Sequence, residues 1–175
     1  VRKLPAGSEV ELSVNPETQR LFITAGRSHF ELPTLPASDF QTMASDDGAT
    51  KFSLDAKDFA RLIDKTRFAI STEETRYYLN GVYLHGAQND GGKAVLRAVA
   101  TDGHRLALAE VPAPKGAENL EGVIIPRKAV AEARRLVDAV EGDIEVEVSD
   151  TKIVVRAGRA VLTSKLIDGS FPDYG

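Results

Sequence analysis

The sequence predicts an α+β protein in which two helices pack on antiparallel sheets and part of the chain is duplicated. Three observations predict this fold class. Most of the chain consists of short runs of alternating apolar and polar residues separated by turn residues, as in antiparallel strands. Two longer stretches, near residues 55–65 and 126–141, instead place apolar residues at helical spacing. A hairpin pattern near the start of the chain also recurs near its end.

The composition excludes several classes of protein. The 175 residues contain no cysteine, which removes disulfides and thiolate metal sites and fits a cytoplasmic protein. No apolar run is long enough to span a membrane, so we expect no membrane partner. The chain begins at Val1 without a signal peptide or an initiator methionine, so we expect a piece of a longer protein. Because the net charge is −4, any binding of nucleic acid must depend on where the 22 basic residues lie.

The first part of the chain has the pattern of three short strands. Residues 10–14 alternate between apolar and polar side chains and end at a turn around Asn15. Leu21–Ile23 and Phe30–Leu32 then flank Gly26. This arrangement predicts a hairpin with Gly26 in its turn.

A linker is predicted after these strands. Residues 41–50 are small and polar and show no periodicity. Segments of this composition commonly connect domains. We therefore predict two domains, the C-terminal part of one in residues 1–45 and a complete one in residues 46–175.

Two amphipathic helices are predicted in the second domain. Lys51–Leu54 lead into the first helix, whose N-cap is Asp55. The second helix begins near Pro126 and ends by Gly142. The apolar stripes that they are expected to bury are Phe59, Leu62 and Ile63 in the first helix and Val130, Ala133, Leu136, Val137 and Val140 in the second.

The remaining segments of the second domain are predicted to be strands. Arg76–Leu84 and Val95–Val99 form a hairpin with a long tip from Gly86 to Gly92, since that segment is rich in glycine and contains asparagine. Two further strands, Ile144–Val148 and Ile153–Val155, follow the second helix. The order of strands and helices is that of an α+β domain.

The end of the chain repeats its beginning. Ala157-Gly158-Arg159 matches Ala25-Gly26-Arg27 at an offset of about 132 positions, and each copy runs on to a closing phenylalanine, Phe40 or Phe171. A shorter similarity relates Ala60–Asp64 in the first helix to Arg134–Asp138 in the second. The alternative is that two unrelated hairpins share the same turn chemistry. Recurrence of several elements in the same order favours a nested duplication.

Four motifs occur in order along the second domain: Arg76–Gly81 (RYYLNG), Ala100–Leu106 (ATDGHRL), Ile125–Lys128 (IPRK) and Thr163–Tyr174 (TSKLIDGSFPDY). Together they resemble the bacterial DNA polymerase III sliding clamp, the beta subunit of the replicative polymerase. The resemblance covers the whole chain and implies the end of the first clamp domain followed by the second. It also implies a ring of three similar domains per chain, built from two chains, with strands outside and helices inside. The segment His85–Ala94 looks longer than is usual in that family.

The resemblance implies that both helices face duplex DNA. Eight basic residues are candidates for this face: Lys57, Arg61, Lys65 and Arg67 on the first helix, and Arg127, Lys128, Arg134 and Arg135 on the second. Such cations attract phosphates without reading bases, which suits a protein that slides. The alternative is an ordinary solvated surface, because Asp58, Asp64, Glu132 and Asp138 share these helices.

The resemblance also implies a cleft that receives short peptides from polymerases, the clamp loader and repair proteins. The residues at matching positions are Arg76, Leu79, Thr101, Gly103, His104, Arg105, Leu106 and Pro172. The leucines and the proline supply apolar walls, and the glycine permits close approach to the backbone. The alternative is that Leu79 and Leu106 are core residues and that residues 101–103 form only a turn.

The sequence gives little support for catalysis. Asp102 and His104 could serve a hydrolase, but the chain lacks the residue spacing of a metal site, a nucleophile elbow or a phosphate-binding loop. We therefore expect no catalytic residues, no metal and no cofactor. The expected partners are double-stranded DNA and partner peptides, within a full-length ring-shaped homodimer of which this chain alone is a monomer. The alternative is a stand-alone peptide-binding scaffold domain without a DNA role.

Overall fold

A computed structural model describes residue 4, residues 6–40 and residues 48–175. The chain divides into two compact units, Val1–Ala44 and Ser45–Gly175, which are described separately. Most of the predicted linker, residues 41–47, lies outside the described residues. Residues 48–50 are described, and a strand already begins at Thr50.

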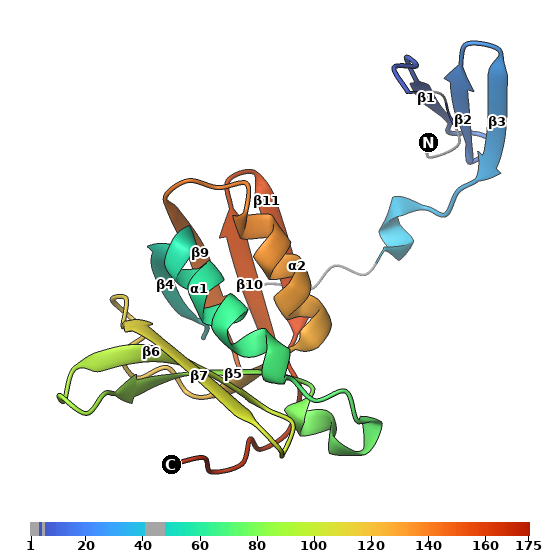
Figure 1. Cartoon of the computed structure of the whole chain (residues 1–175). Helices are drawn as coiled ribbons and strands as arrows, with labels where there is room; N and C mark the ends of the chain where they lie inside the picture. The colour runs from blue at the N-terminus through green and yellow to red at the C-terminus, as the bar shows by residue number, and fades with distance from the viewer. Residues whose placement is uncertain (1–3, 5, 41–47) are drawn as a thin grey trace. The chain divides into compact units, whose positions relative to one another are not determined.

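The first unit is an antiparallel sheet of three strands (Figure 1). Its strands are β1 (Glu11–Asn15), β2 (Arg20–Ala25) and β3 (Ser28–Pro33), followed by a short 3-10 helix, Ala37–Asp39. Ala25 pairs with Ser28 across the turn that contains Gly26, so the predicted hairpin is confirmed. Leu12 and Val14 are about 60% exposed on β1, because no described residue of this unit covers that strand's apolar side chains.

The second unit contains two copies of a strand–helix–three-strand sequence. The first copy consists of β4 (Thr50–Asp55), α1 (Ala56–Thr66), the 3-10 segments Arg67–Ala69 and Glu74–Leu79, β5 (Gly81–Gln88), β6 (Ala94–Thr101) and β7 (Leu106–Pro112). The second copy consists of β8 (Val123–Pro126), α2 (Arg127–Val137), β9 (Asp143–Val148), β10 (Lys152–Ala157) and β11 (Ala160–Lys165). The copies exchange their first strands, because the two four-stranded sheets have the orders β11-β10-β9-β4 and β7-β6-β5-β8. This exchange joins the copies into one body.

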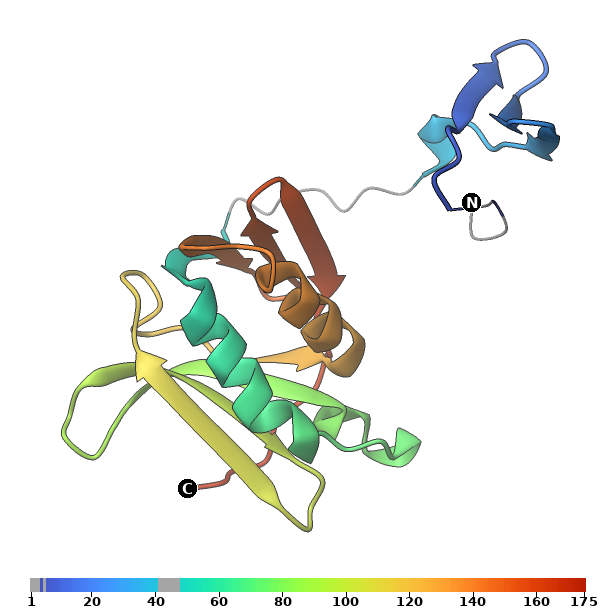
Figure 2. The same ribbon diagram turned by 45° about the horizontal axis from the view of Figure 1, so that its top comes forward.

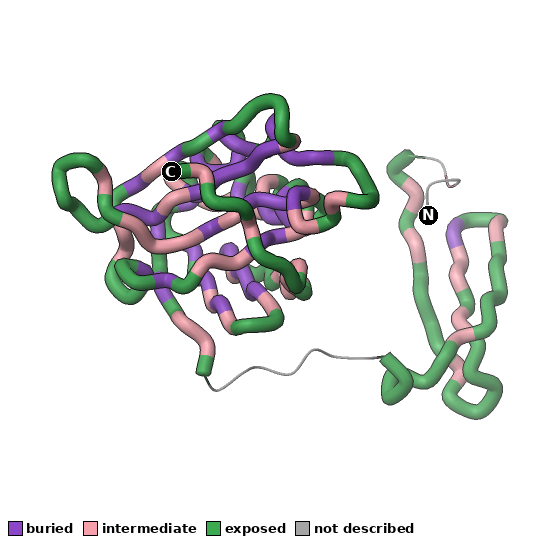
Figure 3. The backbone as a smooth tube through the Cα atoms, turned by 90° about the horizontal axis from the view of Figure 1, so that it is seen from below, coloured by how far each residue is buried: buried purple, intermediate pink, exposed green. Residues whose placement is uncertain are grey.

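The predicted repeat between the two units is confirmed. β9, β10 and β11 each begin 132 residues after β1, β2 and β3, and both triplets have the same antiparallel order. Among the described residues, the apolar side chains of the first strand of the repeat are exposed in the first unit and buried in the second. Ile144 and Val146 are at most 1% exposed there, whereas the matching Leu12 and Val14 are exposed. Figure 3 shows the same contrast in burial between the two units.

Both helices form where the apolar spacing predicted them. The Asp55 carboxylate accepts a hydrogen bond of 2.7 Å from the Lys57 backbone N–H, so Asp55 is the N-cap of α1 as predicted. Pro126 is the N-cap of α2, and Val140 lies beyond its last residue. Of the expected buried residues, only Leu136 and Val140 are half-buried; the others are at most 5% exposed.

One strand was not predicted, and two predictions of local structure are wrong. Lys51–Leu54, which lead into α1 as expected, belong to β4, because they pair with β9 of the other copy, a contact that local sequence does not reveal. Arg76–Leu79 form the end of a 3-10 segment and not a strand. The long tip from Gly86 to Gly92 is also wrong, since β5 continues to Gln88. A Cβ on Gly86 would lie 2.5 Å from the Glu118 carbonyl oxygen, so glycine here permits close approach of another segment and does not mark a turn.

The helices lie side by side, and one hydrophobic core joins them to both sheets (Figures 1 and 2). Along β7, Ala107, Ala109 and Val111 are buried toward this core, while Leu106 and Leu108 are 47% and 44% exposed on the opposite face. The sheet that contains β7 therefore has an inner face under the helices and an outer face.

Candidate functional site

An ion pair joins the two helices. Arg134 Nε on α2 lies 2.8 Å from Asp64 Oδ2 on α1. Arg134 also pairs with Asp138, one turn further along α2. The hydrogen bonds that Arg134 donates to these carboxylates, first to Asp138 and then to Asp64, raise the pKa of its guanidinium. Arg134 therefore fixes the helices against each other.

Five of the eight predicted DNA-facing residues are exposed cations on the helix pair. They are Lys57, Arg61 and Lys65 on α1 and Arg127 and Lys128 on α2. None of the ion pairs found among the described residues involves these five side chains. They remain available to an anionic ligand.

The other three predicted residues are paired with carboxylates. Arg67 lies 3.1 Å from Asp64, and Arg135 lies 3.0 Å from Glu132. The Arg134 side chain is only 21% exposed, which differs from the expected solvent-facing cation. The alternative of helix surfaces with mixed charge thus describes this part of the pair correctly.

The candidate peptide site is built on the turn between β6 and β7. The Thr101 hydroxyl donates to the Arg105 carbonyl at 2.7 Å and accepts from the Gly103 N–H at 3.1 Å. The Asp102 carboxylate accepts from the backbone N–H groups of His104 and Arg105, each at 3.0 Å. These bonds hold the turn in one conformation, with Gly103 at a φ of +88° that favours glycine.

Two arginines border this turn. A Cβ on Gly103 would lie 2.5 Å from an Arg76 guanidinium nitrogen, so Arg76 occupies the space that the glycine leaves open. Arg76 is held by a bidentate pair with Glu73, whose pKa is lowered mainly by that hydrogen bond. Arg105 lies over the ring of Phe68, 5.8 Å from its centroid. Neither Glu73 nor Phe68 was predicted as part of the site.

The predicted apolar residues of the site differ in exposure. Leu79 is 4% exposed and is a buried residue, as the alternative interpretation held. Leu106 is 47% exposed on the outer face of the sheet, next to Leu108, so it can contact a ligand. Pro172 is exposed and lies in the C-terminal strap, which we define as residues 166–175.

The strap runs along the outer face of the sheet, on the side opposite the helices (Figures 1 and 2). The Ile167 N–H donates to the Ile124 carbonyl on β8 at 2.9 Å, and Phe171 stacks on Tyr83. The sequence interpretation missed Tyr83 and His85. Their i, i+2 spacing at the end of the predicted strand Arg76–Leu84, which His85 directly follows, places both rings on one face if the strand continues and was the available signal.

The geometry does not favour catalysis by Asp102 and His104. The carboxylate is bound by the His104 backbone and not by its ring, and these backbone hydrogen bonds lower the pKa of Asp102. Asp102 therefore acts as a turn residue. Among the described residues, no group of three or more His, Asp or Glu side chains could hold a metal ion.

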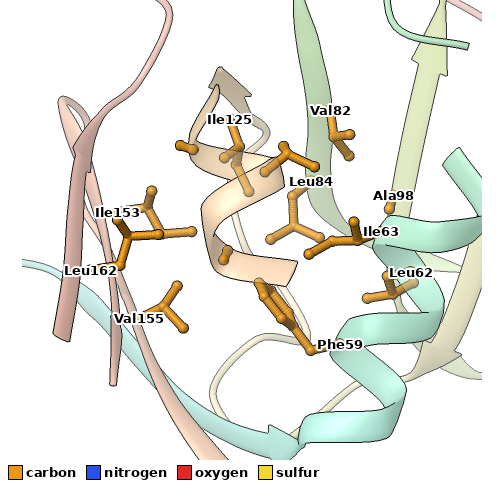
Figure 4. A pocket seen from close by; sticks show the side chains of 13 residues that line it. Phe59, Leu62, Ile63, Val82, Leu84, Ala98, Ile125, Ile153, Val155 and Leu162 are labelled. Atoms are coloured by element: carbon orange, nitrogen blue, oxygen red, sulfur yellow. The ribbon is translucent and has the colours of Figure 1, made fainter. Parts of the chain in front are cut away.

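The cavity inside the core is too small and apolar to be a ligand site. Its volume is about 20 Å³, and it is lined only by apolar residues of both helices and both sheets, including Phe59, Leu84 and Ile153 (Figure 4). A buried water needs polar partners that this lining does not offer. The cavity is a small packing gap between the helices and the sheets.

The duplicated fold and the paired helices define a domain of the DNA-clamp class. The family model described as the central domain of the DNA polymerase III beta subunit matches residues 53–173, and the model of the N-terminal domain of that subunit matches residues 1–44. The chain therefore belongs to the DNA polymerase III beta subunit family. No helix in the described part of the chain is long and apolar enough to cross a membrane.

Sequence relatives and solved structures agree with this assignment. The chain is 59% identical to the beta sliding clamp of Caulobacter vibrioides over 99% of its own length and 46% of the relative's, and 39% identical to that of Escherichia coli over 99% and 45%. A crystal structure of the Caulobacter crescentus beta sliding clamp superposes with a TM-score of 0.90 at 59% identity, covering 99% of this chain and 46% of that one. The sliding clamp of Bartonella birtlesii bound to griselimycin gives 0.88 at 50% identity, covering 99% and 46%. The chain thus spans slightly less than half the length of these relatives.

Proposed function

We propose that this chain is part of a non-catalytic sliding clamp that encircles duplex DNA and tethers the replicative polymerase and other partners. Its relatives carry the name beta sliding clamp. The observation that carries the proposal is the pair of adjacent helices with five exposed cations that have no carboxylate partner among the described ion pairs.

Helix stability does not explain two of these cations. Arg127 and Lys128 occupy the first turn of α2, which contains no acidic residue. Positive charge at a helix N-terminus is unfavourable because of the helix dipole, whereas the free N–H groups there attract phosphate. The placement of both residues is therefore consistent with selection for anion binding.

Charge reversal at these two positions is expected to change DNA binding and stability in opposite directions. The double variant Arg127→Glu with Lys128→Glu is expected to weaken association with duplex DNA, measured by fluorescence anisotropy at low salt. The same variant is expected to unfold at equal or higher urea concentration, since acidic residues stabilise a helix N-terminus by about 0.3–1 kcal/mol each. A matched control, Lys93→Glu with Lys165→Glu, changes the net charge equally at exposed positions outside the helices. Equal loss of DNA binding in both double variants would refute the proposal that DNA binds to the cations of the two helices.

For the second surface, we propose that partner peptides bind beside the turn between β6 and β7. Support comes from the half-exposed Leu106, the fixed turn with Gly103, and the two arginines at its border. A leucine or phenylalanine of a peptide could bury against such an apolar surface. Thr101, His104 and Pro172 complete the proposed set.

Leu106→Asp tests this surface, because it places a charge where the apolar anchor would be buried. We expect it to weaken binding of a fluorescent peptide with a Gln-Leu-x-Leu-Phe type motif. Val161→Asp is the matched control, since Val161 is 54% exposed on β11. Unchanged peptide binding by Leu106→Asp would refute the assignment of the peptide site to this surface. Peptide binding without any DNA association would instead favour the stand-alone scaffold.

We also propose that residues 1–45 belong to a first clamp domain and residues 46–175 form a second, within a full-length ring-shaped homodimer. The separate matches of two family domains to residues 1–44 and 53–173 support this division. On this proposal the 175-residue chain alone is a monomer. A stable dimer in sedimentation experiments would contradict it.

A further inference from the structure

Four aromatic rings fasten the C-terminal strap to the outer face of the sheet. Phe171 stacks on Tyr83 with ring centroids 4.8 Å apart and an interplanar angle of 1°. The ring of Tyr174 lies 6.0 Å from that of His85. Tyr83 and His85 also contact each other, with centroids 4.8 Å apart. Two rings of β5 therefore hold two rings of the strap.

Hydrogen bonds from the sheet also hold the Tyr174 hydroxyl of the strap in place. His85 Nδ1 lies 2.8 Å from the Gly86 carbonyl oxygen, which can only accept, so Nδ1 carries the proton. His85 Nε2 is then an acceptor for the Tyr174 hydroxyl at 2.5 Å. Arg97 donates to the same hydroxyl oxygen at 3.4 Å and is itself held by Glu110 at 2.6 Å. The neutral imidazole thus has both ring nitrogens satisfied.

The fastened strap and the proposed peptide surface share one face of the sheet. Arg97 lies opposite both His85 on β5 and Glu110 on β7. Thr101 follows Arg97 by four residues on β6, so both side chains point to the same face, about 14 Å apart. Thr101 pairs with Leu106, the first residue of β7 and part of the proposed peptide surface. The rings therefore hold the strap along the sheet that carries the turn.

At Gly169 the strap lies beside the segment that leads to this surface. A Cβ on Gly169 would lie 3.1 Å from Tyr78 Cβ, one residue before Leu79. The strap thus passes next to the 3-10 segment that carries Arg76 and then reaches the four rings. Pro172 lies between the two fastened aromatic residues and remains exposed.

We propose that Tyr83, His85 and Arg97 are positioning residues for the peptide surface, because they hold the strap so that Pro172 is in place before a peptide arrives. This inference rests on the proposed peptide-binding function. Ordering a chain segment costs conformational entropy, so a wall that had to be ordered at each binding event would weaken binding. The three residues act through the strap, without contact to the peptide.

The experiment uses the whole 175-residue chain and has two readouts. Backbone ¹⁵N–{¹H} NOE values of Gly169, Ser170, Phe171, Asp173 and Tyr174 report the order of the strap, and peptide anisotropy reports affinity. Tyr83→Ala is expected to lower these NOE values and to weaken peptide binding about 5- to 10-fold. Tyr83→Phe keeps the stacked ring and is expected to restore both readouts.

Further variants separate positioning from a loss of folding. Tyr174→Phe removes the half-buried hydroxyl that His85 and Arg97 share. It is expected to weaken peptide binding about 3- to 5-fold while lowering the melting temperature by only about 2–4 °C. Phe30→Ala removes a half-exposed aromatic ring from the other unit and serves as a control. A loosened strap with unchanged affinity would overturn the positioning role alone. An ordered strap in a parent chain that binds no peptide would refute the proposed peptide function, and the positioning role with it.

Discussion

The number of unpaired cations on α1 and α2 predicts how steeply DNA association depends on salt. Each phosphate that a cation neutralises contributes a slope of about −0.9 to the dependence of log K on log salt concentration. With Lys57, Arg61, Lys65, Arg127 and Lys128 all on phosphates, the slope is about −4.5. Counting all eight predicted basic residues would instead give about −7.

Neutralising two of these cations has a calculable effect. Arg127→Ala with Lys128→Ala is expected to change the slope from about −4.5 to about −2.7. Between 50 and 200 mM salt, the affinity of the parent chain then falls about 500-fold and that of the variant about 40-fold. Arg134→Gln is expected to leave the slope nearly unchanged, because Arg134 is already paired with Asp64 and Asp138.

The assay is a salt titration of fluorescein-labelled duplexes of two unrelated sequences, followed by anisotropy. Both sequences are expected to give the same slope, since phosphate contacts carry no base information. A slope for Arg134→Gln that is reduced as much as that of the double alanine variant would refute the assignment of paired and unpaired cations. Slopes that differ between the two sequences would refute the phosphate-only contact.

Three further predictions concern single side chains. Asp64→Asn is expected to steepen the salt slope by about 1, because Arg67 loses the carboxylate that neutralises it; an unchanged slope would show that Arg67 does not reach DNA. Asp55→Ala is expected to lower the free energy of unfolding by about 1 kcal/mol in urea, since α1 loses its N-cap hydrogen bond; no loss would contradict the cap. Burial, followed by the charge of Arg97, holds the pKa of His85 below 6.5. The unfolded chain therefore takes up this proton first, and stability is expected to rise with pH in the window just below 6.5; His85→Gln should flatten this rise in urea titrations, and an identical profile would exclude His85 as its source.

Local sequence predicted the elements whose structure depends on local chemistry. The N-cap at Asp55, the hairpin at Gly26 and the buried stripe Phe59–Leu62–Ile63 each follow from residue type and spacing. The duplication was also visible, because equivalent elements retain their order. Local sequence did not predict elements that depend on distant partners, such as β4, which pairs with β9 of the other copy.

The candidate site shows the same division. Basic residues at helical spacing could be recognised in the sequence, but their pairing could not: Asp64 neutralises two arginines, one of them 70 residues away. Leu79 and Leu106 have the same chemistry, and only the packing shows that the first is buried and the second half-exposed. The ring contact between Tyr83 and Phe171 likewise depends on tertiary structure.

On the proposed function, duplex DNA contacts the paired helices and no other surface of the second unit. Titration of the ¹⁵N-labelled chain with a short duplex, followed in ¹H–¹⁵N correlation spectra, tests it directly. We expect shifts of the backbone amides near Lys57, Arg61, Lys65, Arg127 and Lys128, with the strap and the outer sheet faces unchanged. Shifts concentrated on the strap or the outer faces, with the helix amides unmoved, would contradict it.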